Sequence, residues 1–71
     1  MNEEQFINPQ NYPVLHAILW DRRHLTRMPV KEALSMYELR WDYVDESRMP
    51  EHEKLFLKEL IQVVGKGKFH V

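Results

Sequence analysis

The chain has 71 residues, no cysteine, and a formal net charge of −1 from 10 basic and 11 acidic side chains. A chain of this length forms one domain with a limited core, and the lack of cysteine excludes disulfides and thiolate metal sites. The near-zero net charge argues against a dedicated nucleic-acid-binding protein, because such proteins gain much of their affinity by neutralising phosphates. We therefore expect a single domain over residues 1–71.

No segment has the pattern of a targeting or membrane sequence. The amino end is acidic at Glu3 and Glu4, whereas a secretory signal begins with basic residues and continues with apolar ones. The apolar run Ala17–Trp20 is far too short to cross a bilayer. These features predict a cytoplasmic protein that does not bind membranes.

The first predicted helix follows an N-terminal segment with few apolar anchors. Residues 1–10 contain an Asn8-Pro9 turn signal and are expected to be flexible or loosely packed. Pro13 suits the first turn of a helix, where its missing N–H costs nothing. Apolar residues then recur at helical spacing through Leu19. The pattern predicts a helix over Pro13–Arg22.

The tripeptide Arg-Met-Pro occurs at residues 27–29 and again at 48–50, and each copy precedes a run of helix-forming residues. Proline at the start predicts helices over Pro29–Asp45 and Pro50–Val64. The repeat reflects either duplication of a helical unit or convergence on a good helix start, and one short match favours convergence.

The last helix is expected to end at Gly65, in the left-handed conformation that glycine adopts most readily. Residues 66–71 are expected to form a C-terminal tail, either free or as a short extended segment that lies back on the helices.

The three predicted helices indicate an all-α fold, a small three-helix bundle. Apolar residues at intervals of three and four positions define the helix faces that should pack together. The expected core consists of Leu15, Ile18, Leu19, Leu34, Tyr37, Trp41, Phe56, Leu60, Ile61 and Val64.

A basic cluster lies between the first two predicted helices, at Arg22, Arg23 and Arg27, with Lys31 shortly after it. These cations could contact an anion or nucleic acid. They could equally stabilise the negative end of the first helix dipole or pair with acidic residues elsewhere. Net charge favours the structural interpretation.

Aromatic residues are numerous for so short a chain, and tryptophan and tyrosine are enriched at interface hot spots. Trp41 lies on the apolar stripe of the second predicted helix and is assigned to the core. Trp20 and Tyr43 lie off the main stripes, and Met36 lies beside one. These three residues are the candidates for a partner surface, with the core as the alternative location.

No catalytic, cofactor or metal constellation is recognisable in the sequence. The four histidines, at positions 16, 24, 52 and 70, lack the spacing of a zinc site. Neither serine lies in a glycine-bracketed turn that would expose a nucleophile. We therefore expect no enzymatic activity, no cofactor and no metal.

The remaining features favour a small non-catalytic protein–protein interaction module or adaptor, which binds another protein or itself. The alternative is a small nucleic-acid-binding regulator that uses Arg22, Arg23 and Arg27.

Overall fold

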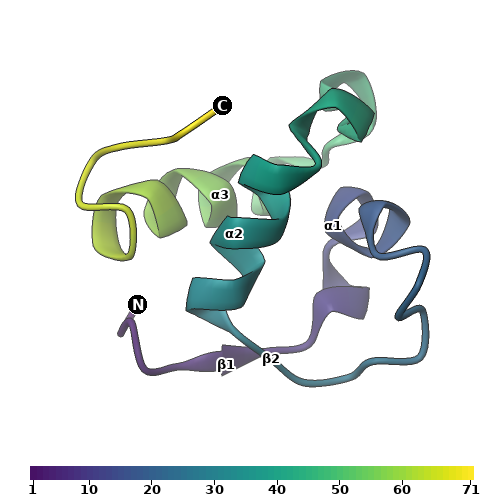
Figure 1. Ribbon diagram of the computed structural model, residues 1–71, viewed down its shortest axis with the longest axis horizontal. Coiled ribbons are helices and arrows are strands. Elements are labelled where there is room, and N and C mark those ends of the chain that lie inside the picture. Colours follow the sequence, from purple (N-terminus) through teal and green to yellow (C-terminus); the bar gives the residue numbers. More distant parts are fainter.

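Three α-helices and a pair of very short strands make up the fold (Figure 1). The computed structural model describes residues 1–71. The expected all-α fold is right for the helices but incomplete, because β1 and β2 pair as a small antiparallel sheet. In chain order the elements are β1 (Phe6–Ile7), η1 (Pro9–Asn11), α1 (Pro13–Ile18), β2 (Met28–Pro29), α2 (Val30–Leu39), η2 (Trp41–Tyr43), η3 (Glu46–Arg48) and α3 (Glu51–Val63), where η marks a 3₁₀-helix.

Both Arg-Met-Pro copies precede a helix, as the sequence predicts. α2 begins directly after Pro29 and α3 directly after Pro50. The backbone φ angles of the two prolines are −61° and −70°, which are the values that the proline ring imposes. Each proline is therefore the capping residue, and its helix begins one residue later than predicted.

The first helix is shorter than predicted: α1 ends at Ile18 rather than Arg22. To continue, the helix would need the Ile18 carbonyl to accept the amide of Arg22. Instead, the Arg40 guanidinium donates a 2.7 Å hydrogen bond to that carbonyl, and the Arg22 amide donates to the carbonyl of Leu19 at 2.9 Å. A contact from α2's C-terminal end thus coincides with the end of α1.

The second helix is also shorter, because α2 ends at Leu39 and not at Asp45. The chain continues through the 3₁₀-helices η2 and η3. The Asp45 side chain accepts a 3.1 Å hydrogen bond from the Ser47 amide, and such local bonds compete with helix formation. The third helix matches its predicted bounds to within one residue at each end.

Residues 1–10, expected to be flexible or loosely packed, are held by β1 and η1. Phe6 lies opposite Pro29 and Ile7 opposite Met28 in the antiparallel pair. The Val30 amide donates a 3.0 Å hydrogen bond to the carbonyl of Gln5, which ties the segment to the start of α2.

The end of α3 differs from the prediction that Gly65 adopts a left-handed conformation. That conformation belongs to Lys66, with φ of 55°, and to Gly67, with φ of 84°. Gly65 is required for another reason: a Cβ there would lie 2.8 Å from the carbonyl oxygen of Ile61 and closer still to that of Lys68.

The C-terminal residues lie back over η2 and α2. The rings of Phe69 and Trp41 meet edge to face with their centroids 5.0 Å apart. The amide of His70 donates a 2.8 Å hydrogen bond to the Glu38 carboxylate.

Most of the predicted core is buried, but three of its members lie at the margin. Trp41, Ile61 and Val64 are only partly buried and pack against the core from outside. Trp41 is displaced because α2 ends before it. The buried apolar residues are Val14, Leu15, Ile18, Leu19, Met28, Val30, Ala33, Leu34, Met36, Tyr37, Met49, Phe56, Leu57 and Leu60.

One carboxylate lies inside this apolar core. The Glu53 side chain is fully buried and accepts hydrogen bonds from the amides of Val14 and Leu15, at 2.9 and 2.8 Å. These amides belong to the first turn of α1, whose N–H groups have no partner within the helix. Glu53 on α3 therefore caps α1 across the core.

Candidate partner-binding surface

Two large aromatic side chains, Trp20 and Tyr43, form the centre of the candidate surface. Trp20 follows the end of α1 and Tyr43 ends η2, so the early termination of both helices brings them together. Their ring centroids are 5.2 Å apart at an interplanar angle of 69°, an edge-to-face arrangement that aromatic pairs favour. Trp20 remains 49% exposed and Tyr43 70% exposed.

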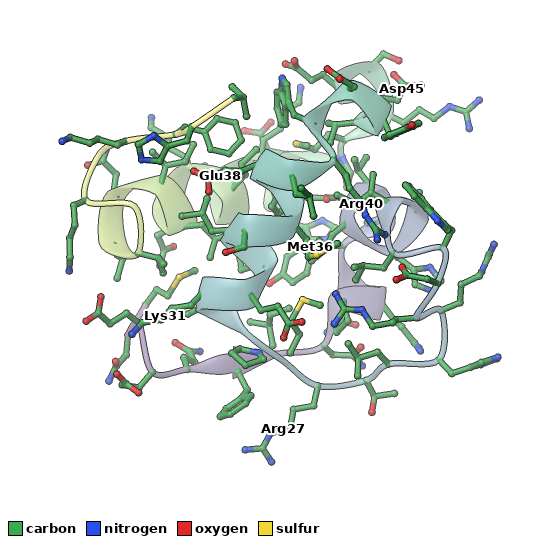
Figure 2. The ribbon with its side chains drawn as sticks, viewed as in Figure 1. Arg27, Lys31, Met36, Glu38, Arg40 and Asp45 are labelled. Carbon is green, nitrogen blue, oxygen red and sulfur yellow. The ribbon has the colours of Figure 1, made fainter.

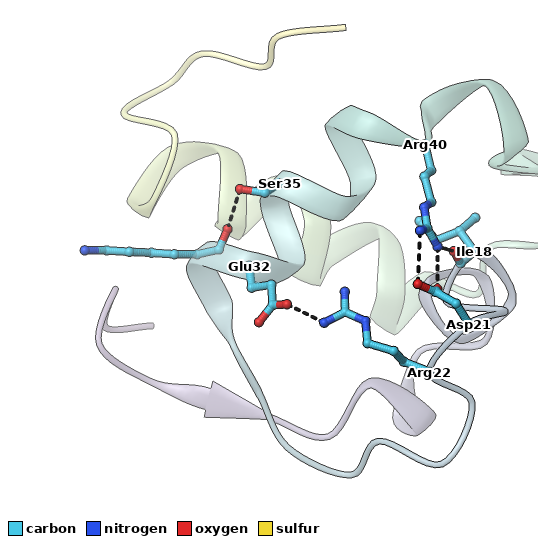
Figure 3. Close-up of polar contacts among 7 residues, drawn as sticks. Ile18, Asp21, Arg22, Glu32, Ser35 and Arg40 are labelled. Atoms are coloured by element: carbon cyan, nitrogen blue, oxygen red, sulfur yellow. Dashed lines mark hydrogen bonds and ion pairs between the residues drawn. The ribbon is translucent and has the colours of Figure 1, made fainter.

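Arg40 fixes the position of the Trp20 ring. Its guanidinium carbon lies 4.2 Å from the ring centroid, within the range of a cation–π contact. The same guanidinium donates two hydrogen bonds to the Asp21 carboxylate, at 2.8 and 3.3 Å, and one to the Ile18 carbonyl (Figure 3). Arg40 therefore connects the Trp20 ring to the Asp21 carboxylate and to the Ile18 carbonyl, and these contacts restrain the ring.

Arg40 and Asp21 together hold the Trp20 ring, and we call this pair the clamp. Both members keep their charges at neutral pH. The hydrogen bond from Arg40 lowers the pKa of the Asp21 carboxyl below its ordinary value. The same hydrogen bond raises the pKa of Arg40. Both groups are ionised under ordinary conditions, so the two-pronged contact persists until acid protonates Asp21.

A hollow of about 360 Å³ lies beside Tyr43. Pro13, Val14 and Ala17 of α1 line one part of it. Its polar rim is the ion pair of Arg48 and Asp45, whose charged atoms are 3.3 Å apart. The hollow offers space for one or two apolar side chains of a partner next to the exposed aromatic rings.

Trp20, Arg40, Tyr43 and the adjoining hollow together form the aromatic surface. Met36, the third residue predicted for a partner surface, does not contribute to it. Its side chain is buried in the core, at 7% exposure, because it lies on the inner face of α2 three positions after the buried Ala33.

The residues of the predicted basic cluster do not converge on one site. Arg22 pairs with Glu32 (Figure 3), and Arg27 lies over the ring of Phe6, with its guanidinium carbon 4.0 Å from the centroid. Figure 2 shows Arg27 pointing away from the body of the molecule, whereas Lys31 lies at the start of α2. Each contact is with a partner inside the chain.

Lys31 and Arg23 also make their contacts within the chain. The Lys31 ammonium lies 3.9 Å from the Glu4 carboxylate. The Arg23 side chain is exposed. The backbone carbonyl of Arg23 accepts a hydrogen bond from the Gln10 side chain and lies 3.0 Å from the His16 ring nitrogen. Arg22, Lys31 and Arg27 therefore contact three different groups, namely Glu32, Glu4 and the Phe6 ring.

The histidines do not assemble with other ligands. His16 and His52 each direct a ring nitrogen to a backbone carbonyl, at 3.0 and 2.7 Å. No three histidine or carboxylate side chains come together as metal ligands would. The longest helix, α3, has 13 residues, and no helix combines the length and hydropathy of a membrane span.

Sequence reasoning missed Arg40, which organises the aromatic surface. A signal was present in the spacing. Arg40 lies seven positions after Ala33 and three after Tyr37, and both of those residues are buried. A charged residue on the apolar stripe of a helix indicates a specific partner nearby. The identity of that partner, Asp21, could not be read from the spacing.

Comparisons with protein-family models, with curated proteins and with solved structures find no match to this chain.

Proposed function

We propose that this chain is a non-catalytic protein–protein interaction module that binds a partner through the aromatic surface. The observation that carries the proposal is the combination of exposure and restraint at Trp20. The ring is half exposed, yet Arg40 stacks on it while held by Asp21. Tryptophan, tyrosine and arginine are the residue types that dominate interface hot spots.

The restraint supports binding because ordering flexible side chains opposes association, by about 0.5–1.5 kcal/mol for each one. Side chains that are already fixed in the free protein avoid much of this cost. The hollow beside Tyr43 then gives a partner's apolar side chain a place to dock. A cytoplasmic location is part of the proposal, since a cysteine-free chain suits a reducing compartment.

Affinity capture from an extract of the producing cells, followed by mass spectrometry, tests the proposal. The bait proteins are the unmodified chain, Tyr43→Ala and Leu55→Ala. Tyr43 is 70% exposed, so its truncation should leave folding intact; Leu55 is 57% exposed and lies on α3, away from the aromatic surface. Circular dichroism verifies that all three baits are folded.

We expect at least one protein that the unmodified chain and Leu55→Ala retain and that Tyr43→Ala loses. Identical protein sets for all three baits would refute the proposal. Sedimentation velocity over a wide range of protein concentration identifies the case in which the partner is a second copy, and Tyr43→Ala should then weaken dimerisation.

A further inference from the structure

A second hollow, of about 240 Å³, is lined by residues of the segment 41–49 and of α3. Trp41, Met49 and Leu57 form apolar walls, and Glu46, Lys54 and Lys58 lie at its edge. We name this hollow the α3 cleft. Its volume is smaller than the roughly 300–1,000 Å³ of typical small-molecule pockets, so it fits a single large side chain better than a cofactor.

The two lysines of the α3 cleft have no ionic partner. Lys54 and Lys58 are exposed and lie four residues apart on α3, so they are neighbours on one helix face. Neither ammonium lies within 4.0 Å of a carboxylate, although Lys31 and Lys66 are both paired. Like charges at this spacing repel each other and destabilise a helix, and a bound anion would relieve that repulsion.

We propose that the α3 cleft is a second docking site, for a short segment of a protein partner that carries a large apolar side chain next to aspartate or glutamate. The apolar side chain enters between Met49 and Leu57, and the carboxylate lies between Lys54 and Lys58. The choice of an acidic segment rests on charge complementarity, because the two unpaired cations outnumber the single acid, Glu46, that lines the cleft.

This second site goes beyond the proposed function because it shares no residue with the aromatic surface. The segment 41–49 separates the two hollows: Tyr43, Asp45 and Arg48 line the first, whereas Trp41, Glu46 and Met49 line the second. The proposal therefore gives two partners separate sites that share one short stretch of chain, as an adaptor requires.

Selection from a library of random dodecapeptides displayed on phage tests the α3 cleft. The immobilised proteins are the unmodified chain, the charge-reversed variant Lys54→Glu/Lys58→Glu, and the control Arg23→Glu/Lys68→Glu. The control reverses two exposed cations that form no ion pair and lie outside the cleft. Circular dichroism checks folding, and fluorescence anisotropy of synthetic copies of the selected peptides gives affinities.

The unmodified chain and the control should both select peptides that combine aspartate or glutamate with a large apolar residue. Charge reversal of Lys54 and Lys58 should lower the affinity for these peptides by about tenfold or more. Added salt should lower the affinity of the unmodified chain for them. Three results would overturn the proposal. The first is no enrichment of such peptides, and the second is equal binding of the selected peptides to the charge-reversed variant. The third is a single-stranded oligonucleotide probe that binds more tightly than any selected peptide and whose binding is lost on charge reversal. The Tyr43→Ala variant should bind the selected peptides normally, which separates this outcome from that of the aromatic surface.

Discussion

The hydroxyl group of Tyr37 donates a 2.7 Å hydrogen bond to the carboxylate of Glu53, and both side chains are fully buried. Glu53 also caps the first turn of α1 through the amides of Val14 and Leu15. A single carboxylate on α3 thus joins all three helices. Burial and the hydrogen bond to Glu53 raise the pKa of Tyr37, so the phenol stays protonated and keeps donating.

Replacing Glu53 with glutamine should destabilise the protein by about 3 kcal/mol. The three hydrogen bonds lose their charge assistance, and the NH₂ group of the glutamine side chain, itself a donor, faces another donor. Tyr37→Phe removes one donor and should cost about 1–2 kcal/mol. Urea denaturation measures both free energies of unfolding. The combined variant should lose less than the sum of the two, since the residues contact each other. A Glu53→Gln variant as stable as the unmodified chain would exclude this role for the carboxylate.

The apolar core depends on α3, and two leucines on that helix provide a matched comparison. Leu60 is fully buried and Leu55 is 57% exposed. Leu60→Ala should cost about 2–5 kcal/mol because it leaves a cavity, whereas Leu55→Ala should change the free energy of unfolding by less than about 0.5 kcal/mol. Thermal melting followed by circular dichroism distinguishes them. Equal melting temperatures for the two variants would mean that α3 does not bury Leu60 and expose Leu55 as described.

Acid should loosen the clamp on Trp20. The pKa of Asp21 is lowered in the folded state by its hydrogen bond from Arg40, so the carboxyl binds its proton more weakly in the folded than in the unfolded chain. The stabilisation is therefore complete above the ordinary aspartate pKa of about 3.9 and is lost as the pH falls through the lowered value.

The matched variant for this prediction is Asp21→Asn. At pH 6 the unmodified chain should be more stable than Asp21→Asn, and the difference should shrink as the pH falls below about 3.9. Urea denaturation at several pH values gives the difference directly, and tryptophan fluorescence in a Trp41→Phe background reports the environment of the Trp20 ring. A stability difference that stays constant from pH 6 to acid would contradict the assignment of the pKa shift to Arg40.

The two glycines in the turn after α3, Gly65 and Gly67, are needed for different reasons. At Gly65 an added Cβ would overlap the carbonyl oxygens of Ile61 and Lys68, and backbone cannot move as easily as a side chain. At Gly67 the space is open, and only the φ of 84° opposes a side chain. Gly67→Ala should therefore cost about 1–2 kcal/mol, and Gly65→Ala should cost more. The reverse order in denaturation experiments would show that the backbone conformation at Gly67 costs more than the close approach at Gly65, and would contradict this account.

The starts of the helices could be predicted from sequence because proline acts locally. Pro29 and Pro50 fix the backbone just before α2 and α3 whatever the rest of the chain does. The ends of α1 and α2 could not be predicted in this way. The contact of Arg40 with the Ile18 carbonyl joins residues 22 positions apart, and a local pattern carries no information about such a contact.

The strands and the buried acid illustrate two different limits of sequence reasoning. β1 and β2 have two residues each, too few for the alternation that identifies a strand. Glu53 did leave a signal, because it precedes the buried residues Phe56, Leu57 and Leu60 by three, four and seven positions. Glu53 also lies in the first turn of α3, where the helix dipole favours an acidic residue whether or not it is buried, so the spacing alone does not identify its burial.

The candidate surface was partly visible in the sequence. Trp20 and Tyr43 lie off the apolar stripes, and the structure leaves both exposed. Their contact with each other could not be foreseen, because a helix over Pro29–Asp45 would have placed Tyr43 on a continuous rod. Only the early end of α2 turns Tyr43 toward Trp20.

Nuclear magnetic resonance mapping with the partner recovered by affinity capture tests binding at the aromatic surface most directly. The measurement follows the indole N–H of Trp20 and the amides of Ala17 and Tyr43 during titration with that partner, alongside the amides of Phe6 and Leu55 as exposed references outside the aromatic surface. We expect the first three signals to shift or broaden together while the references stay fixed. Shifts confined to the references, with Trp20 and Tyr43 unchanged, would contradict the proposed function.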